Sequence, residues 1–444
     1  MIVPELTEVS QRLMQTKGVS EHMQEYTPSL TPAHMHSHGS LESSSVAQGK
    51  LAFSQWLDVM RWIAALSVVL AHSANRFLVR ITDVDADHRT VAFYFFSLLA
   101  GFAHEAVMIF FVLSGYLVGG GLWKEARSST SIDLPKYLIK RVSRLCIVLY
   151  PAFMTILLLN LLGIYAFNGL ATGVYAAKVL HTMQPASFAC NAVFMQTALC
   201  EPYGDDGALW SLYNEFWYYL IWPLIVLGIL AASMWRRAFL LIAASFLLVA
   251  LTLIQSRDVS AIGPYMFIWV LGVGVAAIPR PLIRSCLASV VMFLLGLSAD
   301  RLLVRRTFAE LHPVGGFFVD ALISVLFANL LVTMRFHRSL RLPIGTTWNT
   351  WLASFSFSLY CIHIPILNLY GAVLTFYTGA GWQMVPDRIW KWGVVLGALA
   401  LSVVSAYGFS RLTEAHTEKL RRCLLDALAS ARPADPPRGR VGMY

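Results

Sequence analysis

The amino-acid sequence predicts an all-α integral membrane protein, a bundle of about ten transmembrane helices with both termini in the cytoplasm. The chain of 444 residues is 57% hydrophobic and only 13% charged, with a mean hydropathy of +0.61, whereas soluble domains carry about 25% charged residues. Apolar runs recur along the chain, and about 20 apolar residues suffice to span a bilayer as a helix. The runs are continuous rather than alternating with period two, which excludes a transmembrane β-barrel.

Ten of these runs are predicted to cross the membrane. In order they are residues 56–78, 92–122, 145–167, 209–232, 237–255, 262–279, 283–298, 316–335, 349–375 and 389–411. A shorter apolar stretch at 187–199 is interpreted as a re-entrant or interfacial segment. Residues 51–412 therefore form one transmembrane domain, between a disordered polar tail at 1–50 and a basic tail at 413–444 that begins with an amphipathic stretch suited to the inner membrane surface.

The basic residues are distributed unequally between alternate loops. With the N-terminus placed inside, 23 of the 34 Lys and Arg residues lie in inner segments and ten in outer segments, while Arg61 lies within a helix. This is the positive-inside pattern of multi-pass membrane proteins. It explains the net charge of +9 without a nucleic-acid partner, and it favours a location in the inner (plasma) membrane.

Two cysteines and two acidic residues stand in the longest outer connection. Cys190 and Cys200 flank a segment predicted to face an oxidising compartment, where they are able to pair, and the alternative is that both fill small apolar spaces. Asp205 and Asp206 follow in a glycine-flanked loop and are interpreted as solvated turn residues.

Three histidines alternate in the N-terminal tail. His34, His36 and His38 have a spacing compatible with metal binding, but a solvated tail is favoured because no further ligand cluster is nearby. We therefore predict neither a metal nor a bound cofactor.

The stretch MRWIAALSVVLAHSA, residues 60–74, places two ionisable side chains in the first span. Arg61 and His72 are eleven positions apart, which puts them on one face of the helix and about 16 Å apart along its axis. Ionisable residues inside a membrane bundle are costly and are functional candidates by default. Taken singly, the Arg is also compatible with snorkelling to the interface, and the His with a hydrogen bond between helices.

The fourth predicted span contains LWSLYNEFWYYLIWPLI, residues 209–225. Glu215 lies in its outer half, at a depth comparable to that of His72, and a carboxylate there would support an imidazole acting as a base. The alternative is that Glu215 caps the start of the helix together with Ser211.

Three further patterns carry polar groups at membrane depth or at its inner edge. FSFSLYCIHIPI puts Ser356, Tyr360 and His363 on one helical face, and FFVLSGYLVGGG combines Ser114 with glycines that permit close helix approach or a ligand passage. KRVSRL places three cations at the cytoplasmic mouth, where they match phosphate groups or simply obey the positive-inside rule; they are Lys140, Arg141 and Arg144.

Five short patterns in the chain, taken in order, resemble those of the membrane-bound acyltransferase family 3. They are LDVMRWIAALSVVLAH, in which Asp58 precedes an Arg, ten residues and a His, then FFVLSGYLVG, RVSRL, LWSLYNEFWYYLIWP and FSFSLYCIHIPI. Together they cover residues 54–410. The resemblance implies a stand-alone member of the family, without the C-terminal esterase-like domain that many members carry.

The resemblance also implies a reaction and roles for the residues. It implies an O-acyltransferase that takes an acyl group, above all acetyl, from cytoplasmic acyl-CoA to a hydroxyl of a sugar or polysaccharide. The expected catalytic residues are His72 as the base and Glu215; the expected acyl-CoA-binding residues are Arg61, Arg141, Arg144, Lys140 and Ser114; and the expected acceptor or pore-lining residues are His363, Tyr360, Asp58 and Trp210.

The expected partners follow from this reaction. They are membrane lipid, acyl-CoA as a co-substrate and a glycan or other hydroxyl acceptor, with a homo-oligomer or polysaccharide-biosynthesis proteins as further candidates. The alternative function is a multi-span transporter that uses the buried His, Glu and Arg as a proton or anion relay. Internal repeats are typical of transporters, and the sequence shows none, which favours the enzyme.

Overall fold

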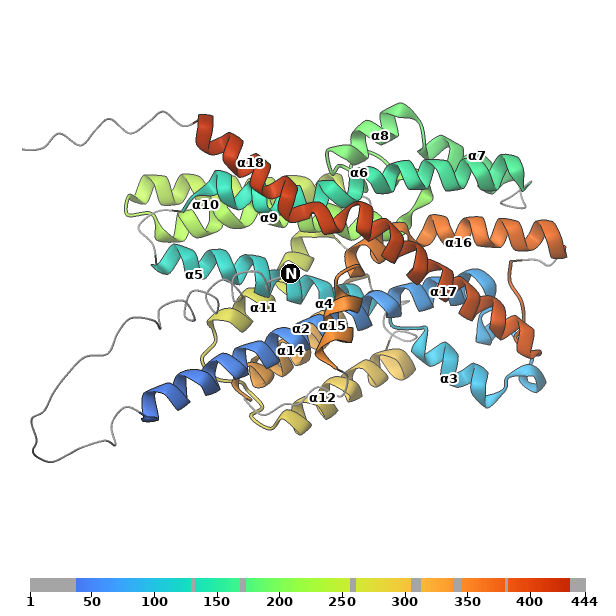
Figure 1. The fold of residues 1–444 in the computed structure, drawn as a ribbon, viewed down its shortest axis with the longest axis horizontal. Helices are drawn as coiled ribbons and strands as arrows, with labels where there is room; N and C mark the ends of the chain where they lie inside the picture. Colours follow the sequence, from blue (N-terminus) through green and yellow to red (C-terminus); the bar gives the residue numbers. More distant parts are fainter. Residues whose placement is uncertain are drawn as a thin grey trace, which may run out of the picture.

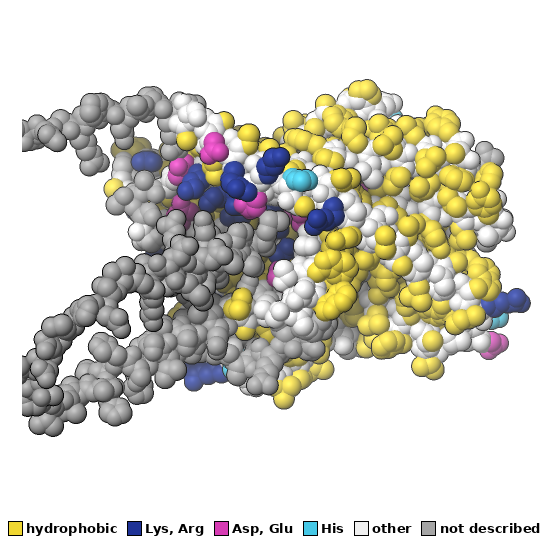
Figure 2. Space-filling view, viewed as in Figure 1, with side chains coloured by type: hydrophobic (Ala, Val, Ile, Leu, Met, Phe, Trp, Pro, Cys, Tyr) yellow, Lys and Arg dark blue, Asp and Glu magenta, His cyan; other side chains and the backbone are white. Residues whose placement is uncertain are grey.

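The computed structural model describes residues 37–128, 132–167, 173–255, 261–304, 313–337, 345–379 and 382–431, and they form a bundle of helices (Figure 1). Most of the long helices run along the longest axis of the molecule. Within these ranges the chain forms no strand and only two isolated β-bridges. The predicted all-α class is therefore confirmed. Figure 2 shows hydrophobic side chains over much of the visible face, with Lys and Arg gathered where α18 lies.

Seven helical segments among the described residues are long and apolar enough to cross a membrane. They are Leu51–Phe77, Val91–Ser128, Leu134–Ala166, Met234–Ile254, Gly316–Phe336, Ser356–Thr378 and Ile389–Ser430. The corresponding helices are α2 (Ser37–Phe77), α3 (Val91–Leu99) to α5 (Gly120–Ser128), α6 (Leu134–Ala166), α10 (Met234–Ile254), α14 (Pro313–Phe336), α16 (Ser356–Thr378) and α17 (Ile389–Leu412) with α18 (Thr417–Ala431).

Three more helices cover the remaining predicted spans. They are α9 (Trp210–Leu230), α11 (Ile262–Ala277) and α12 (Cys286–Ala299). Each predicted apolar run is thus helical, while the number of membrane crossings and the side on which the termini lie stay predictions.

The structure corrects the boundary of the N-terminal tail. α2 begins at Ser37, so residues 37–50 are helical rather than part of the disordered segment that we predicted. This stretch contains no proline, and a helix that already exists extends at little cost once its nucleus has formed. The rest of the tail, including His34 and His36, lies outside the described residues, and the described part holds no cluster suited to a metal ion.

Two predicted spans are interrupted, and both breaks lie close to predicted site residues. The second span divides into α3, α4 (Ala103–Ser114), a π-helical turn at Gly115–Gly119, and α5. The ninth divides into α15 (Thr346–Ala353) and α16. π-Helical turns often occur at functional positions.

Helices α4 and α11 cross with their backbones in contact. A Cβ atom added to Gly115 would lie 1.8 Å from the carbonyl oxygen of Trp269, and one added to Gly272 would lie 2.0 Å from that of Val112. Only glycine fits at both positions, because any side chain would force the two helices apart. Of the two interpretations of the glycine-rich pattern, close helix approach is the one that applies to Gly115.

The outer connection between α6 and α9 is an ordered structure. It contains α7 (Gly173–Thr182), α8 (Pro185–Ala192) and a disulfide bond between Cys190 and Cys200. The buried Asn191 joins the two ends of this loop, since its amide nitrogen donates to the carbonyl of Glu201 and its amide oxygen accepts from the backbone of Tyr203. The disulfide, one of two alternatives from the sequence, is present in the structure.

Asp206 departs from the sequence interpretation as a solvated turn residue. Its side chain is fully buried, and one carboxylate oxygen accepts a hydrogen bond from the backbone nitrogen of Ala208 at 3.2 Å. Burial raises the pKa of this carboxyl well above its usual value, and the charge of neighbouring Asp205 raises it further. Asp205 itself pairs with Lys178 at 2.8 Å. A turn sequence has no feature that distinguishes these two environments.

Replacing Asp206 with asparagine is expected to raise the melting temperature of the detergent-solubilised protein by a few degrees near neutral pH. In the unfolded chain this carboxyl ionises above about pH 4, whereas in the folded protein its raised pKa keeps it protonated to a higher pH, so that folding has to take up a proton. Its contribution to folding stability therefore falls as the pH rises. Thermal unfolding of wild type and Asp206→Asn as a function of pH should show curves that meet near about pH 4 and separate above it.

The matched control is Asp205→Asn. This substitution removes a partly exposed ion pair and is expected to cost about 0–1 kcal/mol. An Asp206→Asn variant less stable than wild type at neutral pH would contradict the assignment.

Candidate functional site

A cleft of ≈ 860 Å³ lies between helices of the bundle. Five helices contribute to its walls, namely α2, α4, α6, α9 and α16. Six of the residues that line it were predicted from the sequence as site residues: Arg61, Ser114, Arg141, Arg144, Glu215 and Tyr360. Ser211 and Ser356 line it as well. Segments far apart in the chain thus bring their costly polar groups to one cavity, as expected for ionisable residues in a membrane bundle.

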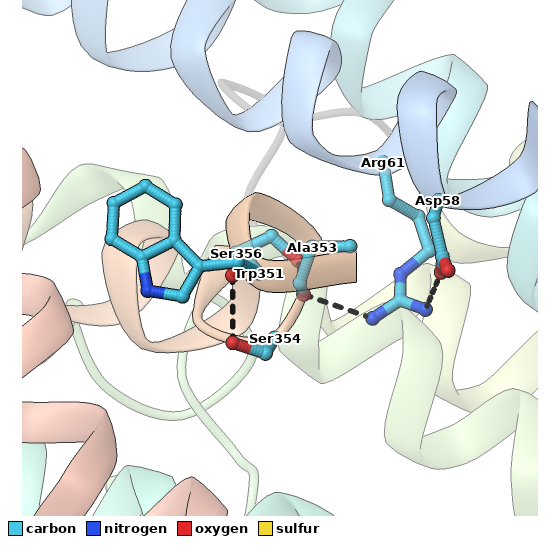
Figure 3. A network of polar contacts seen from close by, with 6 residues as sticks. All are labelled: Asp58, Arg61, Trp351, Ala353, Ser354 and Ser356. Atoms are coloured by element: carbon cyan, nitrogen blue, oxygen red, sulfur yellow. Dashed lines mark hydrogen bonds and ion pairs between the residues drawn. The ribbon is translucent and has the colours of Figure 1, made fainter. Parts of the chain in front are cut away.

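Arg61 is held at the break between α15 and α16 (Figure 3). Its guanidinium pairs with Asp58, one turn earlier on α2, at 3.1 Å and donates to the carbonyl oxygen of Ala353 at 3.2 Å. The same carbonyl accepts from the hydroxyl of Ser356 at 2.9 Å. The helix break therefore leaves a carbonyl available to fix the guanidinium, and Asp58 acts on Arg61 rather than reaching the cleft wall.

Two further arginines from α6 line the same end of the cleft. Arg141 stacks over the ring of Tyr137 at 5.8 Å, and its Nε atom is buried without a hydrogen-bond partner among the described residues. Arg144 is exposed and interacts electrostatically with Arg61. Three guanidinium groups at one mouth suit a bound anion, since Arg binds phosphate oxygens through paired hydrogen bonds.

Glu215 also lines the cleft and takes part in a chain of hydrogen bonds. Trp269 Nε1 donates to the hydroxyl of Ser114 at 3.1 Å, and that hydroxyl donates to Glu215 at 2.8 Å. Tyr219, one turn further along α9, also donates to Glu215. The expected pairing of Glu215 with His72 is therefore wrong, because the carboxylate accepts hydrogen bonds from Ser114 and Tyr219 instead.

His72 pairs with a second histidine. Its Nδ1 atom lies 2.9 Å from Nε2 of His363, and the two rings are stacked with centroids 5.0 Å apart. His363 is fully buried, whereas His72 is partly accessible. The sequence analysis predicted His363 to be an acceptor or pore-lining residue. In the structure it contacts the Nδ1 atom of His72.

The proton positions in this pair follow from the other contacts of His363. Its Nδ1 atom lies 2.8 Å from the carbonyl oxygen of Tyr360 and 3.1 Å from that of Leu359. Carbonyl oxygens only accept hydrogen bonds, so Nδ1 carries the proton and Nε2 of a neutral His363 is an acceptor. His72 must then donate from Nδ1, which leaves the lone pair of its Nε2 free to accept a proton.

Tyr360 connects the histidine pair to the cleft. Its hydroxyl lies 2.5 Å from the carbonyl oxygen of Ala208 and 2.7 Å from the hydroxyl of Ser211. The only phenolic proton goes to the carbonyl, so Ser211 donates to Tyr360. Tyr360 lines the cleft and stands one turn from His363 on α16. The cleft thus extends from the arginines to the immediate neighbourhood of the histidine pair.

Five predicted residues do not line the cleft: they are His72, His363, Asp58, Trp210 and Lys140. Trp210 packs its ring edge-on against Phe111 at 5.9 Å, which is a packing contact between α9 and α4. Lys140 lies next to Arg141 on α6 but is not among the cleft-lining residues.

Two residues that contact the site were not predicted. Tyr219 follows Glu215 by four positions, a spacing that puts both on one helical face and would have identified it. Glu414 contacts Ser358 near the start of α16 and interacts with Arg144 and Arg61. Glu414 is an isolated acidic residue after a long apolar run, and this feature of the sequence would have identified it as a candidate.

Comparison with known proteins agrees with this site. The chain is 31% identical over 157 residues to an uncharacterized protein of Haemophilus influenzae, a match that covers 33% of this chain and 58% of that relative. No solved structure matches the chain. The family model described as an acyltransferase domain matches residues 54–411, the region that contains all the cleft-lining residues. The chain therefore belongs to the acyltransferase family 3.

Proposed function

We propose that the protein is a transmembrane O-acyltransferase that moves an acetyl group from cytoplasmic acyl-CoA to a hydroxyl of a sugar or polysaccharide on the other side of the plasma membrane. The observation that supports this most is the uneven distribution of arginine and histidine side chains along the cleft. Three arginines stand at one end, and a histidine with a free lone pair stands beyond the other. The axial rise from Arg61 to His72, about 16 Å, is comparable to the length of an extended pantetheine arm.

In the proposed reaction the arginines bind the phosphates of the donor, and the thioester lies near Tyr360. Nε2 of His72 removes the proton from the acceptor hydroxyl as its oxygen attacks the thioester carbonyl. The new C–O bond forms, the C–S bond breaks, and the thiolate of CoA leaves, taking up a proton. General-base catalysis of this kind contributes about 10²–10⁴-fold to a rate.

Glu215 is assigned a role different from the catalytic one, in support of His72, that the sequence predicted. Its two hydrogen-bond donors, Ser114 and Tyr219, hold it at the wall of the cleft. We assign Glu215 and Ser114 to the passage through which the pantetheine arm runs, where fixed polar groups align the thioester with the base.

The test uses purified protein in vesicles supplied with radiolabelled acetyl-CoA and a panel of hydroxyl acceptors. The measurements are release of the CoA thiol and transfer of label to the acceptor. Thiol release that depends on an acceptor is the expected result. Flux of protons or anions without any thioester cleavage would overturn the proposal in favour of a transporter. Chemical analysis of surface glycans from cells with and without the protein would then identify the acceptor.

A further inference from the structure

A cluster of four cations lies where α18 packs against the inner end of α6. Lys136, Lys140 and Arg141 come from α6, and Arg421 comes from α18; the other three all interact electrostatically with Lys140. Two carboxylates moderate the cluster, since Glu125 also acts on Lys140 and Glu418 pairs with Arg421. Figure 2 shows the gathering of Lys and Arg at this place. Like charges held together repel one another, and a bound polyanion would relieve that repulsion.

The position of α18 is fixed by a buried contact. Glu414, between α17 and α18, is only 7% exposed and accepts from the backbone nitrogen of Ser358 at 3.1 Å and from its hydroxyl at 2.8 Å. These groups belong to the first turn of α16, where an anion is stabilised by the helix dipole. The carboxylate thus ties the C-terminal segment to the same helix that carries His363.

Arg421 and its neighbour differ in their surroundings. Arg421 is partly buried and lies close enough to Lys140 of α6 to act on it electrostatically, whereas Arg422 is exposed. Both follow the part of the chain that the family model matches, which ends at residue 411. Arg421 therefore belongs to the cationic cluster, and Arg422 is an exposed cation of the same helix that is not among the charges acting on Lys140.

We propose that α18 completes the donor site, with Arg421 and Lys140 binding the 3′-phosphate at the nucleotide end of acyl-CoA. This inference rests on the proposed function. Arg141 belongs both to the cluster and to the cleft wall, so the cluster continues the cleft outward. Lys140 and Arg421 lie beyond the cleft wall. With the thioester inside the cleft, the diphosphate reaches the cleft-lining arginines, and the ribose 3′-phosphate extends to the outer cations.

The experiment measures the affinity of the purified full-length protein for CoA and for dephospho-CoA, which lacks the 3′-phosphate. Wild type should bind CoA more tightly than dephospho-CoA by about tenfold, the effect of one charge-assisted contact. Arg421→Ala should reduce that difference by weakening CoA binding alone, with Lys140 accounting for what remains, and Arg421→Lys should retain more of it. Arg422→Ala, which removes the same charge from the same helix, should leave both affinities at the wild-type values.

The possible outcomes distinguish failure of the role proposed for Arg421 from failure of the proposed function. Failure of wild type to bind CoA would overturn the proposed function. CoA binding that Arg421→Ala and Arg422→Ala affect equally would leave the proposed function standing and overturn the role of Arg421. Equal loss of CoA and dephospho-CoA in Arg421→Ala would also overturn it, because displacement of the helix rather than loss of a phosphate contact would then explain the result.

Discussion

Replacing His72 with alanine is expected to lower the acyl-transfer rate by about 10²–10⁴-fold, the range that general-base catalysis contributes. His72 has the nitrogen whose lone pair the contacts of His363 leave free, and alanine cannot accept the proton of the acceptor hydroxyl. The affinity for CoA should not change, because the arginines that would bind the phosphates lie at the other end of the cleft. The measurement is the acceptor-dependent release of CoA, with CoA affinity determined in parallel.

His88→Ala is the matched control for this experiment. His88 is an exposed histidine in an outer loop, away from the cleft, and its replacement should leave the rate unchanged. An active His72→Ala protein would show that the base is a different group. A His72→Ala protein that no longer binds CoA would show that the residue acts in binding or folding instead.

Replacing His363 with alanine is expected to lower the rate by about 10–100-fold, the effect typical of a group that orients a reactive one. His363 is a positioning residue, since its Nε2 accepts the proton of His72 Nδ1 and thereby keeps Nε2 of His72 unprotonated. In His363→Ala the tautomer of His72 is no longer fixed, and its N–H loses a partner, which costs about 1–3 kcal/mol of stability.

His363→Gln separates the two effects. The amide oxygen of glutamine accepts a hydrogen bond, so this variant should recover part of the rate that alanine loses. Rates for wild type and both variants, each normalised to the fraction of protein that is folded, provide the comparison. Equal rates for glutamine and alanine would show that His363 contributes packing and not the tautomer of His72.

Much of the fold follows from local properties of the sequence. Length and apolarity of a run predict a membrane helix irrespective of its neighbours, and every predicted run is helical in the structure. The gathering of Arg61, Arg141 and Glu215 in one cleft was equally predictable, because charged groups in a bundle avoid lipid. Which charged groups touch was not predictable.

The pairing of His72 shows the reason. Glu215 was predicted at a depth comparable to that of His72, and His363 was predicted only to share a polar helical face with Tyr360. The choice between them as the partner of His72 depends on how α9 and α16 are rotated and displaced in the bundle. One residue step turns a helix by about 100°, so a small change in packing exchanges one partner for the other. The burial of Asp206 and the contact of Glu414 with Ser358 likewise depend on packing between distant segments.

Under the proposed function, the contact between α4 and α11 is expected to influence where the selectivity for the acyl group resides. Main-chain atoms meet at Gly115 and Gly272, so α4 has no space to retreat when a bulkier donor enters. Ser114 directly precedes this contact, and the wall that it forms is rigid. Discrimination by chain length is therefore left to the side chains of α6 and α16, among them Leu145 and Phe357, which line the cleft from the other helices. Relatives that transfer longer acyl groups should differ at those two positions and retain both glycines.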